Sequence, residues 1–222
     1  MKIKRNLLIS VGLGLVMMFA VWTVLIQVVD VQSIGANGTD IGFATVNWWF
    51  HSLTGVNMVL YDITDWLGLV PVFACIMFAF VGFIQLVKRK SLRKVDFDII
   101  ILGIYYLTVI IFYLFFETVP INYRPVLIDG VLEASYPSST TLLVLCVMPT
   151  VVLQSEKRLK NKSVKSLIFI LSVLFILFTV IGRILSGVHW LTDIIGSVLL
   201  SAGLFIIYTA VVGIKQDNFE EG

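Results

Sequence analysis

The chain has 222 residues, of which 59% are hydrophobic and only 14% are charged, and its mean hydropathy is +1.00. A soluble domain carries about 25% charged residues, so this composition excludes an ordinary soluble globular protein. The formal net charge of +2 says little by itself, because the distribution of charge matters more than its sum when a chain crosses a bilayer. We expect an all-α polytopic membrane protein whose main surroundings are the bilayer, with no nucleic-acid partner.

Apolar runs recur along the whole chain and predict six transmembrane helices in one domain, residues 1–222. The first run follows a basic start, but it is too long for a signal peptide and lacks a cleavage site. The fourth is the weakest, because it is short and Pro149 interrupts it, and we expect it to begin a few residues earlier. The six predicted spans are Leu7–Val29, Leu67–Val87, Ile99–Phe116, Thr140–Leu153, Ser166–Leu185 and Ile194–Ile214.

Two connections are long, residues 30–66 and 117–139, and these are where chemistry can be housed. The first is polar and aromatic, and its Trp48–Trp49 pair favours the headgroup level of a membrane. We therefore expect part of it to lie along the membrane surface. His51 in the same connection is either a surface histidine or an acid that folds over the site.

Basic residues predict the orientation of the chain. With six spans, both termini and the turns at 88–98 and 154–165 share one side, and 14 of the 16 basic residues fall on that side. The positive-inside bias makes it the cytoplasmic side. The two basic residues on the other side are Arg124 and Arg183. We expect an integral protein of a bacterial cell membrane with cytoplasmic termini and an outward-facing site.

The segment Gly182–Asp193 joins the fifth and sixth spans and holds three charged or titratable residues. Such residues are costly near hydrocarbon, so a functional role is the default hypothesis. If a helix begins near His189, then His189 and Asp193 lie one turn apart on one face. The carboxylate can then hold one imidazole nitrogen protonated while the other nitrogen faces a substrate. Arg183 adds a charged fork suited to phosphate oxygens, so the segment indicates phosphoryl transfer.

Together with Arg124–Pro125 and Pro137–Ser138–Ser139, this segment resembles the three motifs of the type 2 phosphatidate phosphatase family, which shares its core with vanadium-dependent haloperoxidases. The family pattern is Lys, six residues, Arg-Pro; then Pro-Ser-Gly-His; then Ser-Arg, five residues, His, three residues, Asp. The spacing here agrees throughout. The resemblance also implies six spans and an outward-facing site.

The resemblance implies a role for each matching residue. His189 attacks phosphorus and forms a phosphohistidine, and Asp193 orients it. The phosphate is bound by residues of all three motifs, without a metal or other cofactor: Arg124, Arg183, Ser138 and Ser139. The expected activity is hydrolysis of a lipid phosphate or diphosphate.

Three motif positions depart from the family. Glu117 replaces its lysine, Gly182 replaces its serine, and Ser139–Thr140 replace its Gly-His. The family's histidine at that last position protonates the leaving group, which threonine cannot do near neutral pH. General acid catalysis is typically worth about 10²–10⁴ in rate. A diphosphate expels a phosphate monoester with a second pKa of about 6, which leaves with little help. We therefore expect a diphosphate, such as a polyprenyl diphosphate, to be preferred to phosphatidate.

Several alternatives remain open at the level of sequence. Glu117 can pair with Arg124, turn away, bind a cation or be protonated. The protein can be a catalytically silent relative that binds phospholipid headgroups or a membrane partner. A transporter built around the same charges is a third hypothesis, although no charged residue lies deep within a predicted span. The same residues can also have a purely structural role. His189 and Asp193 can form only a capping pair at a helix start, and the Pro-Ser-Ser turn can be only a helix N-cap.

Overall fold

The computed structural model describes residues 2–220, and the side chains of residues 3–213. All regular elements in this part of the chain are helices, and no strand occurs in it. In chain order they are α1 (Lys2–Val28), η1 (Ala36–Gly38), α2 (Ala44–Thr54), α3 (Met58–Leu67), α4 (Leu69–Arg89), η2 (Leu92–Lys94), α5 (Phe97–Thr118), α6 (Ser139–Arg158), α7 (Lys162–Leu185) and α8 (Leu191–Glu220).

Six helical segments of the described chain are long and apolar enough to cross a membrane, which confirms the predicted all-α architecture with six spans. The third and fourth helices, α3 and α4, together form one of these segments. The spans are Ile3–Val28, Met58–Arg89, Phe97–Thr118, Ser139–Arg158, Lys162–Leu185 and Leu191–Gly213.

The second span begins at Met58, nine residues before the predicted start at Leu67. The prediction was wrong here because Asp62 and Asp65 break the apolar pattern of α3, although the helix itself is well formed. Asn57 caps it, since its Oδ1 accepts the backbone N–H of Leu60 at 3.0 Å. The connection that we expected to be a loop therefore holds two helices, α2 and α3.

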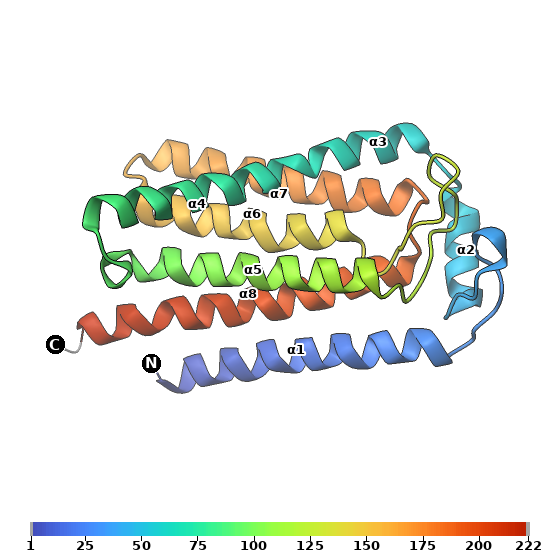
Figure 1. Cartoon of the computed structure of the whole chain (residues 1–222), viewed down its shortest axis with the longest axis horizontal. Coiled ribbons are helices and arrows are strands. Elements are labelled where there is room, and N and C mark those ends of the chain that lie inside the picture. The colour runs from blue at the N-terminus through green and yellow to red at the C-terminus, as the bar shows by residue number, and fades with distance from the viewer. Residues whose placement is uncertain (1, 221–222) are drawn as a thin grey trace.

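The two ends of the bundle differ in the connections that lie there (Figure 1). The start of α1, the last turns of α8 and the two short connections α4–α5 and α6–α7 lie at one end. The longer connections lie at the other end, where α2 runs across the bundle. Trp48 and Trp49 project from α2 and are exposed. The predicted functional residues of the two longer connections therefore gather at the end opposite the termini.

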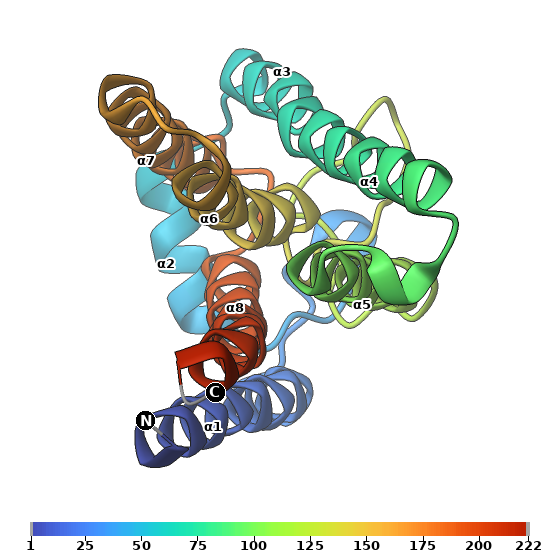
Figure 2. The same ribbon diagram turned by 90° about the vertical axis from the view of Figure 1, so that its left-hand side faces the viewer.

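The helix α6 lies among α4, α5, α7 and α8 (Figure 2). It begins at Ser139, as the Pro-Ser-Ser turn predicted, but the expected interruption at Pro149 was wrong, because the helix continues to Arg158. Proline lacks an N–H donor, and neighbouring hydroxyls donate to carbonyls of the preceding turn. Tyr105 donates to the carbonyl of Cys146 at 3.1 Å, and Thr150 donates to that of Val147 at 2.7 Å.

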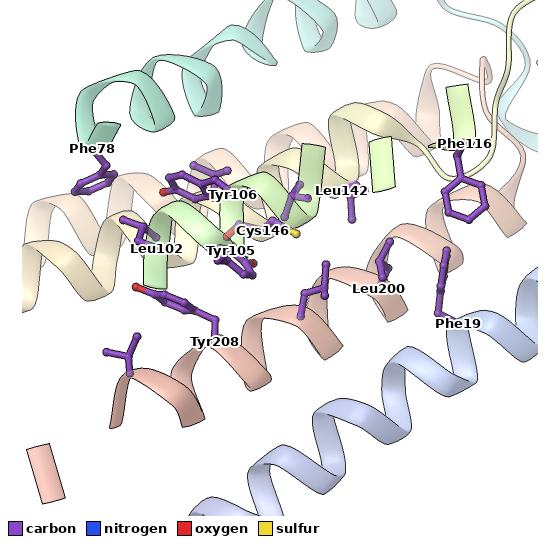
Figure 3. Close-up of a cluster of buried hydrophobic side chains, with 14 of the residues drawn as sticks. Phe19, Phe78, Leu102, Tyr105, Tyr106, Phe116, Leu142, Cys146, Leu200 and Tyr208 are labelled. Carbon is purple, nitrogen blue, oxygen red and sulfur yellow. Dashed lines mark hydrogen bonds between the residues drawn. The ribbon is translucent and has the colours of Figure 1, made fainter. Parts of the chain in front are cut away.

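A buried aromatic and aliphatic cluster fills the bundle between α1, α5, α6 and α8 (Figure 3). At its outer end, the ring of Tyr136 stacks on Phe19 with centroids 5.9 Å apart. Its hydroxyl lies 2.7 Å from Thr23 Oγ1, and its ring leaves no space for a side chain at Gly196. Tyr136 therefore fixes the connection before α6 against both α1 and α8.

The close packing of α3 on α7 depends on Gly182. A Cβ atom there would lie 2.6 Å from Thr64 Cγ2, so the glycine at this motif position has a structural reason. Small residues let helices approach in this way.

We predict that Gly182→Ala destabilises the protein by about 1–3 kcal/mol, because the added methyl group must push α3 away from α7. Gly103→Ala is the matched control, since a Cβ there meets no described atom within 4 Å. The control is expected to be neutral, or stabilising by up to about 1 kcal/mol. Thermal unfolding in detergent measures both variants, and equal shifts would contradict the packing argument.

Candidate active site

His189 lies in the connection between α7 and α8, and its two ring nitrogens have different neighbours. Nδ1 lies 3.1 Å from the carbonyl oxygen of Ser135 and 3.1 Å from the Ser135 hydroxyl. Nε2 lies 3.4 Å from Nη1 of Arg124. A carbonyl can only accept and a guanidinium can only donate, so these contacts assign the proton to Nδ1. The lone pair of Nε2 then faces Arg124.

Burial keeps this imidazole neutral. Desolvation lowers the pKa of His189 well below its usual value, and the positive charges of Arg124 and Arg183 lower it further. A neutral ring with its proton on Nδ1 presents Nε2 as a nucleophile.

Asp193 is fully buried one turn after His189, in the first turn of α8. Its Oδ2 accepts a short hydrogen bond from the Ser135 hydroxyl and a 2.9 Å bond from the backbone N–H of Trp190. Asn122 donates to Oδ1 at 3.4 Å. The distance from Oδ2 to His189 Nδ1 is 3.7 Å, longer than a hydrogen bond. Asp193 therefore caps α8 and acts on the imidazole chiefly through Ser135.

Arg124 follows α5 in the connection 119–138, and its side chain is buried. Its backbone N–H donates to the carbonyl of Glu133 at 3.1 Å, and its Nε lies 3.0 Å from the Glu133 carboxylate. Its guanidinium carbon lies 5.5 Å from the centroid of the Tyr61 ring. The ion-pair partner of Arg124 is thus Glu133, which the sequence did not indicate, and not Glu117.

Arg183 lies in the last turn of α7 and its side chain is almost completely buried. One nitrogen, Nη2, donates to Asp65 Oδ1 at 2.8 Å and to Thr140 Oγ1 at 2.6 Å. Its guanidinium carbon lies 4.8 Å from the same Tyr61 ring centroid. Asp65 and Tyr61 are one turn apart on α3, the helix whose start was mispredicted.

The two arginines share one neighbour, the Tyr61 ring. Their guanidinium carbons lie 5.5 and 4.8 Å from its centroid, so both belong to the same end of the bundle. Within the described residues, Nε of Arg183 is buried and lacks a hydrogen-bond acceptor, whereas Nε of Arg124 faces the carboxylate of Glu133. A buried donor without an acceptor is rare and costly, so Nε of Arg183 can receive an anion.

The remaining predicted residues lie around this group in different ways. Ser138 is buried, and its hydroxyl donates to Thr141 at 3.0 Å, so that hydroxyl is already engaged. Ser139 begins α6 and lines the cavities on both sides of it. Thr140 accepts from Arg183. Glu117 is exposed at the end of α5 and lines the same small cavity as His189.

Among the described residues, His51 makes no hydrogen bond to His189, Arg124 or Arg183, and its buried Nδ1 has no hydrogen-bond partner. Its ring packs 5.5 Å from that of Trp190, and burial lowers its pKa. It is half-buried, so it is not an ordinary surface histidine either.

Two cavities meet at Tyr113, Ser139 and Leu142. The smaller is narrow, with a volume of about 10 Å³, and reaches His189. The larger has a volume of about 400 Å³, is lined mostly by apolar residues of α4, α5 and α6, and reaches Asp65 and Thr140. A third apolar cavity of about 620 Å³ shares Cys75 and Ile110 with the second and continues between α4 and α5.

Five residues of the site were missed by the sequence analysis: Asn122, Ser135, Tyr61, Asp65 and Glu133. A hydroxyl two residues before a Pro-Ser turn and an acid within a weakly apolar segment are common features. No signal in a single sequence distinguishes them from loop or surface residues.

A buried histidine, two buried arginines and a helix N-terminus lie at one end of this bundle of membrane-spanning helices, beside apolar cavities. Within the described residues, no group of three or more His, Cys, Asp or Glu side chains is placed to hold a metal ion.

Comparison with known proteins agrees with this architecture. The sequence model of the PAP2 superfamily matches residues 72–217, so the chain belongs to that superfamily, as the three motifs predicted. The comparison with curated proteins finds no match. Among solved structures, the chain is similar to the crystal structure of the first transmembrane PAP2 type phosphatidylglycerolphosphate phosphatase from Bacillus subtilis. The TM-score is 0.60 at 17% identity, over 93% of this chain and 96% of that one.

The depressed pKa of His189 predicts how stability depends on pH. In the unfolded chain this histidine binds a proton near its ordinary pKa of 6.5, whereas in the folded protein it does so only at much lower pH. Above about pH 6.5 the histidine is neutral in both states and does not change the free energy of unfolding. Below that pH the unfolded chain gains a proton first, so the free energy of unfolding decreases. We predict that His189→Gln loses less thermal stability than the unsubstituted protein between about pH 7.5 and 5.5. Identical pH dependence in the two proteins would contradict the assignment.

Proposed function

We propose that this protein hydrolyses a lipid phosphate or diphosphate at the outer face of a bacterial cell membrane, through a phosphohistidine on His189. The observation that carries the proposal is the placement of His189 Nε2, with Nδ1 locked by Ser135 and a buried arginine 3.4 Å away. Membership of the PAP2 superfamily supports a lipid-phosphatase-like activity.

In the proposed reaction, the two arginines bind the phosphoryl oxygens and Nε2 of His189 attacks phosphorus. The free Nε donor of Arg183 and the N-terminal amides of α6 at Ser139 stabilise the charge that develops on the oxygens. Ser135 and Asp193 keep the proton on Nδ1 and stabilise the ring once it has become charged. The leaving group takes the electron pair of the broken P–O bond.

The lipid chain of the substrate occupies the apolar cavities. The cavity at Asp65 and Thr140 continues into the one between α4 and α5, and exposed apolar residues of both helices surround it. A chain lying there keeps its hydrocarbon out of water while its phosphate reaches the arginines.

A diphosphate substrate fits this site better than a monoester. The hydroxyl of Thr140 already accepts a hydrogen bond from Arg183 at 2.6 Å, and threonine is too weak an acid to protonate an alkoxide. A departing phosphate monoester needs little protonation, because its second pKa is about 6. We propose a polyprenyl diphosphate as the substrate.

A silent relative is the second candidate, and one observation favours it. Each arginine of the site pairs with a carboxylate of the protein itself, Asp65 or Glu133, so a phosphate must compete with these acids. In that case the pocket binds phospholipid headgroups or supports a membrane partner without turnover.

We predict that a polyprenyl diphosphate labelled in its terminal phosphate transfers that label to the purified protein, and that His189→Ala abolishes the transfer. Hydrolysis of the diphosphate is expected to exceed that of phosphatidate by at least about 10²-fold, the lower range of general acid catalysis. Acid-labile, base-stable label distinguishes phosphohistidine from a phosphoester. Absence of His189-dependent label and turnover would favour the silent relative.

The orientation gives a separate prediction. Val131 lies exposed in the connection before α6, and Lys160 lies exposed between α6 and α7 at the other end of the bundle. In a background without Cys75 and Cys146, Val131→Cys is expected to react with an impermeant reagent in intact cells. Lys160→Cys should react only after the cells are opened. The reverse pattern would place the site on the cytoplasmic side.

A further inference from the structure

Asp65 has no role in the reaction described above, although it contacts Arg183, which binds the phosphoryl group in that reaction. It belongs to α3, which precedes the part of the chain that matches the superfamily. Its carboxylate is 2.8 Å from Arg183 and remains 54% exposed. Among the described residues that line the larger cavity at the site, it is the one carboxylate.

Asp65 and His189 contact different arginines of the site. His189 contacts Arg124, Arg124 and Arg183 lie over the Tyr61 ring, and Arg183 contacts Asp65. A phosphoryl group held by both arginines therefore has the nucleophile beside Arg124 and the carboxylate beside Arg183.

Displacement at phosphorus proceeds with the attacking and leaving groups roughly in line. In the proposed function the lipid leaving group lies in the apolar cavity that Asp65 lines, so it departs toward that cavity when His189 attacks. In the second half of the reaction, water must attack from that same side, opposite the bond to Nε2.

We propose that Asp65 is the general base that activates this water, an inference that rests on the proposed function. Water oxygen bonds to phosphorus as its proton passes to the Asp65 carboxylate. The N–P bond breaks, its electron pair returns to Nε2, and the imidazole is again neutral with its proton on Nδ1. Asp65 then loses its proton to solvent, which reaches its half-exposed side chain.

The other polar groups near the site are less well placed for this step. Glu133 pairs with Arg124, on the side of the nucleophile, and Glu117 lines the cavity that reaches His189. The hydroxyl of Thr140 accepts from Arg183 and is itself a weak base.

The test separates formation of the phosphoenzyme from its hydrolysis, using the labelled polyprenyl diphosphate. In Asp65→Asn, which keeps the size of the side chain, phosphohistidine should form while phosphate release falls about 10²-fold or more, so that label accumulates on the protein. Asp62→Asn is the matched control on an exposed position of the same helix, and both steps should be unchanged.

Thr140→Val removes the other side chain that accepts a hydrogen bond from Nη2 of Arg183. It is therefore the control for an effect that comes only from a displaced Arg183 side chain. It should slow formation and release together, without accumulation of label. If Asp65→Asn slows formation and release together, or leaves release unchanged, Asp65 is not the base.

Should the asparagine variant fail to fold, Asp65→Ser with added formate decides the case. Phosphate release restored by formate supports Asp65 as the base, and no restoration overturns the proposal. Lack of His189-dependent label in the unsubstituted protein would instead overturn the proposed function, and this inference with it.

Discussion

Arg124 and Arg183 hold two positive charges in a buried place, over a single tyrosine ring. Two like charges near each other repel, and burial adds a further penalty for each because each loses its hydration. The ring face of Tyr61 and the carboxylates of Asp65 and Glu133 offset this cost. Tyr61 and Asp65 belong to α3, so α3 must pack close to α7 for them to offset the buried positive charge. Gly182 makes that close packing possible.

Burial is the main reason why the pKa of His189 is low and its imidazole neutral, and the positive charges of Arg124 and Arg183 lower that pKa further. The carboxylate of Asp193 lies 3.7 Å from the imidazole and makes no direct hydrogen bond to it. Ser135 supplies the direct contact instead, and its hydroxyl passes the orienting effect of Asp193 to Nδ1. The nucleophile and its positive neighbours thus form one electrostatic unit, contributed by α7, α8 and the connection before α6.

The spans and the motif residues could be predicted from the sequence because they depend on local patterns. Long apolar runs identify helices, and the spacing of His189 and Asp193 follows from the helical repeat. Asp65 and Ser135 could not be found in this way, since their roles depend on residues 118 and 54 positions away in the chain. Pro149 misled the prediction because a proline inside a helix is tolerated where neighbouring helices pack around it, and α6 is surrounded by α4, α5, α7 and α8.

Tyr136 and Gly196 have a consequence for how this site can change over time. A Cβ atom at Gly196 would lie 2.8 Å from the tyrosine ring carbon Cζ, and Tyr136 follows directly after Ser135. The glycine lies one turn beyond Asp193 on α8. A larger residue at position 196 would therefore move the serine away from the histidine and aspartate unless a smaller ring replaced the tyrosine at once. In a diverging lineage, positions 136 and 196 are free to vary only as a coupled pair.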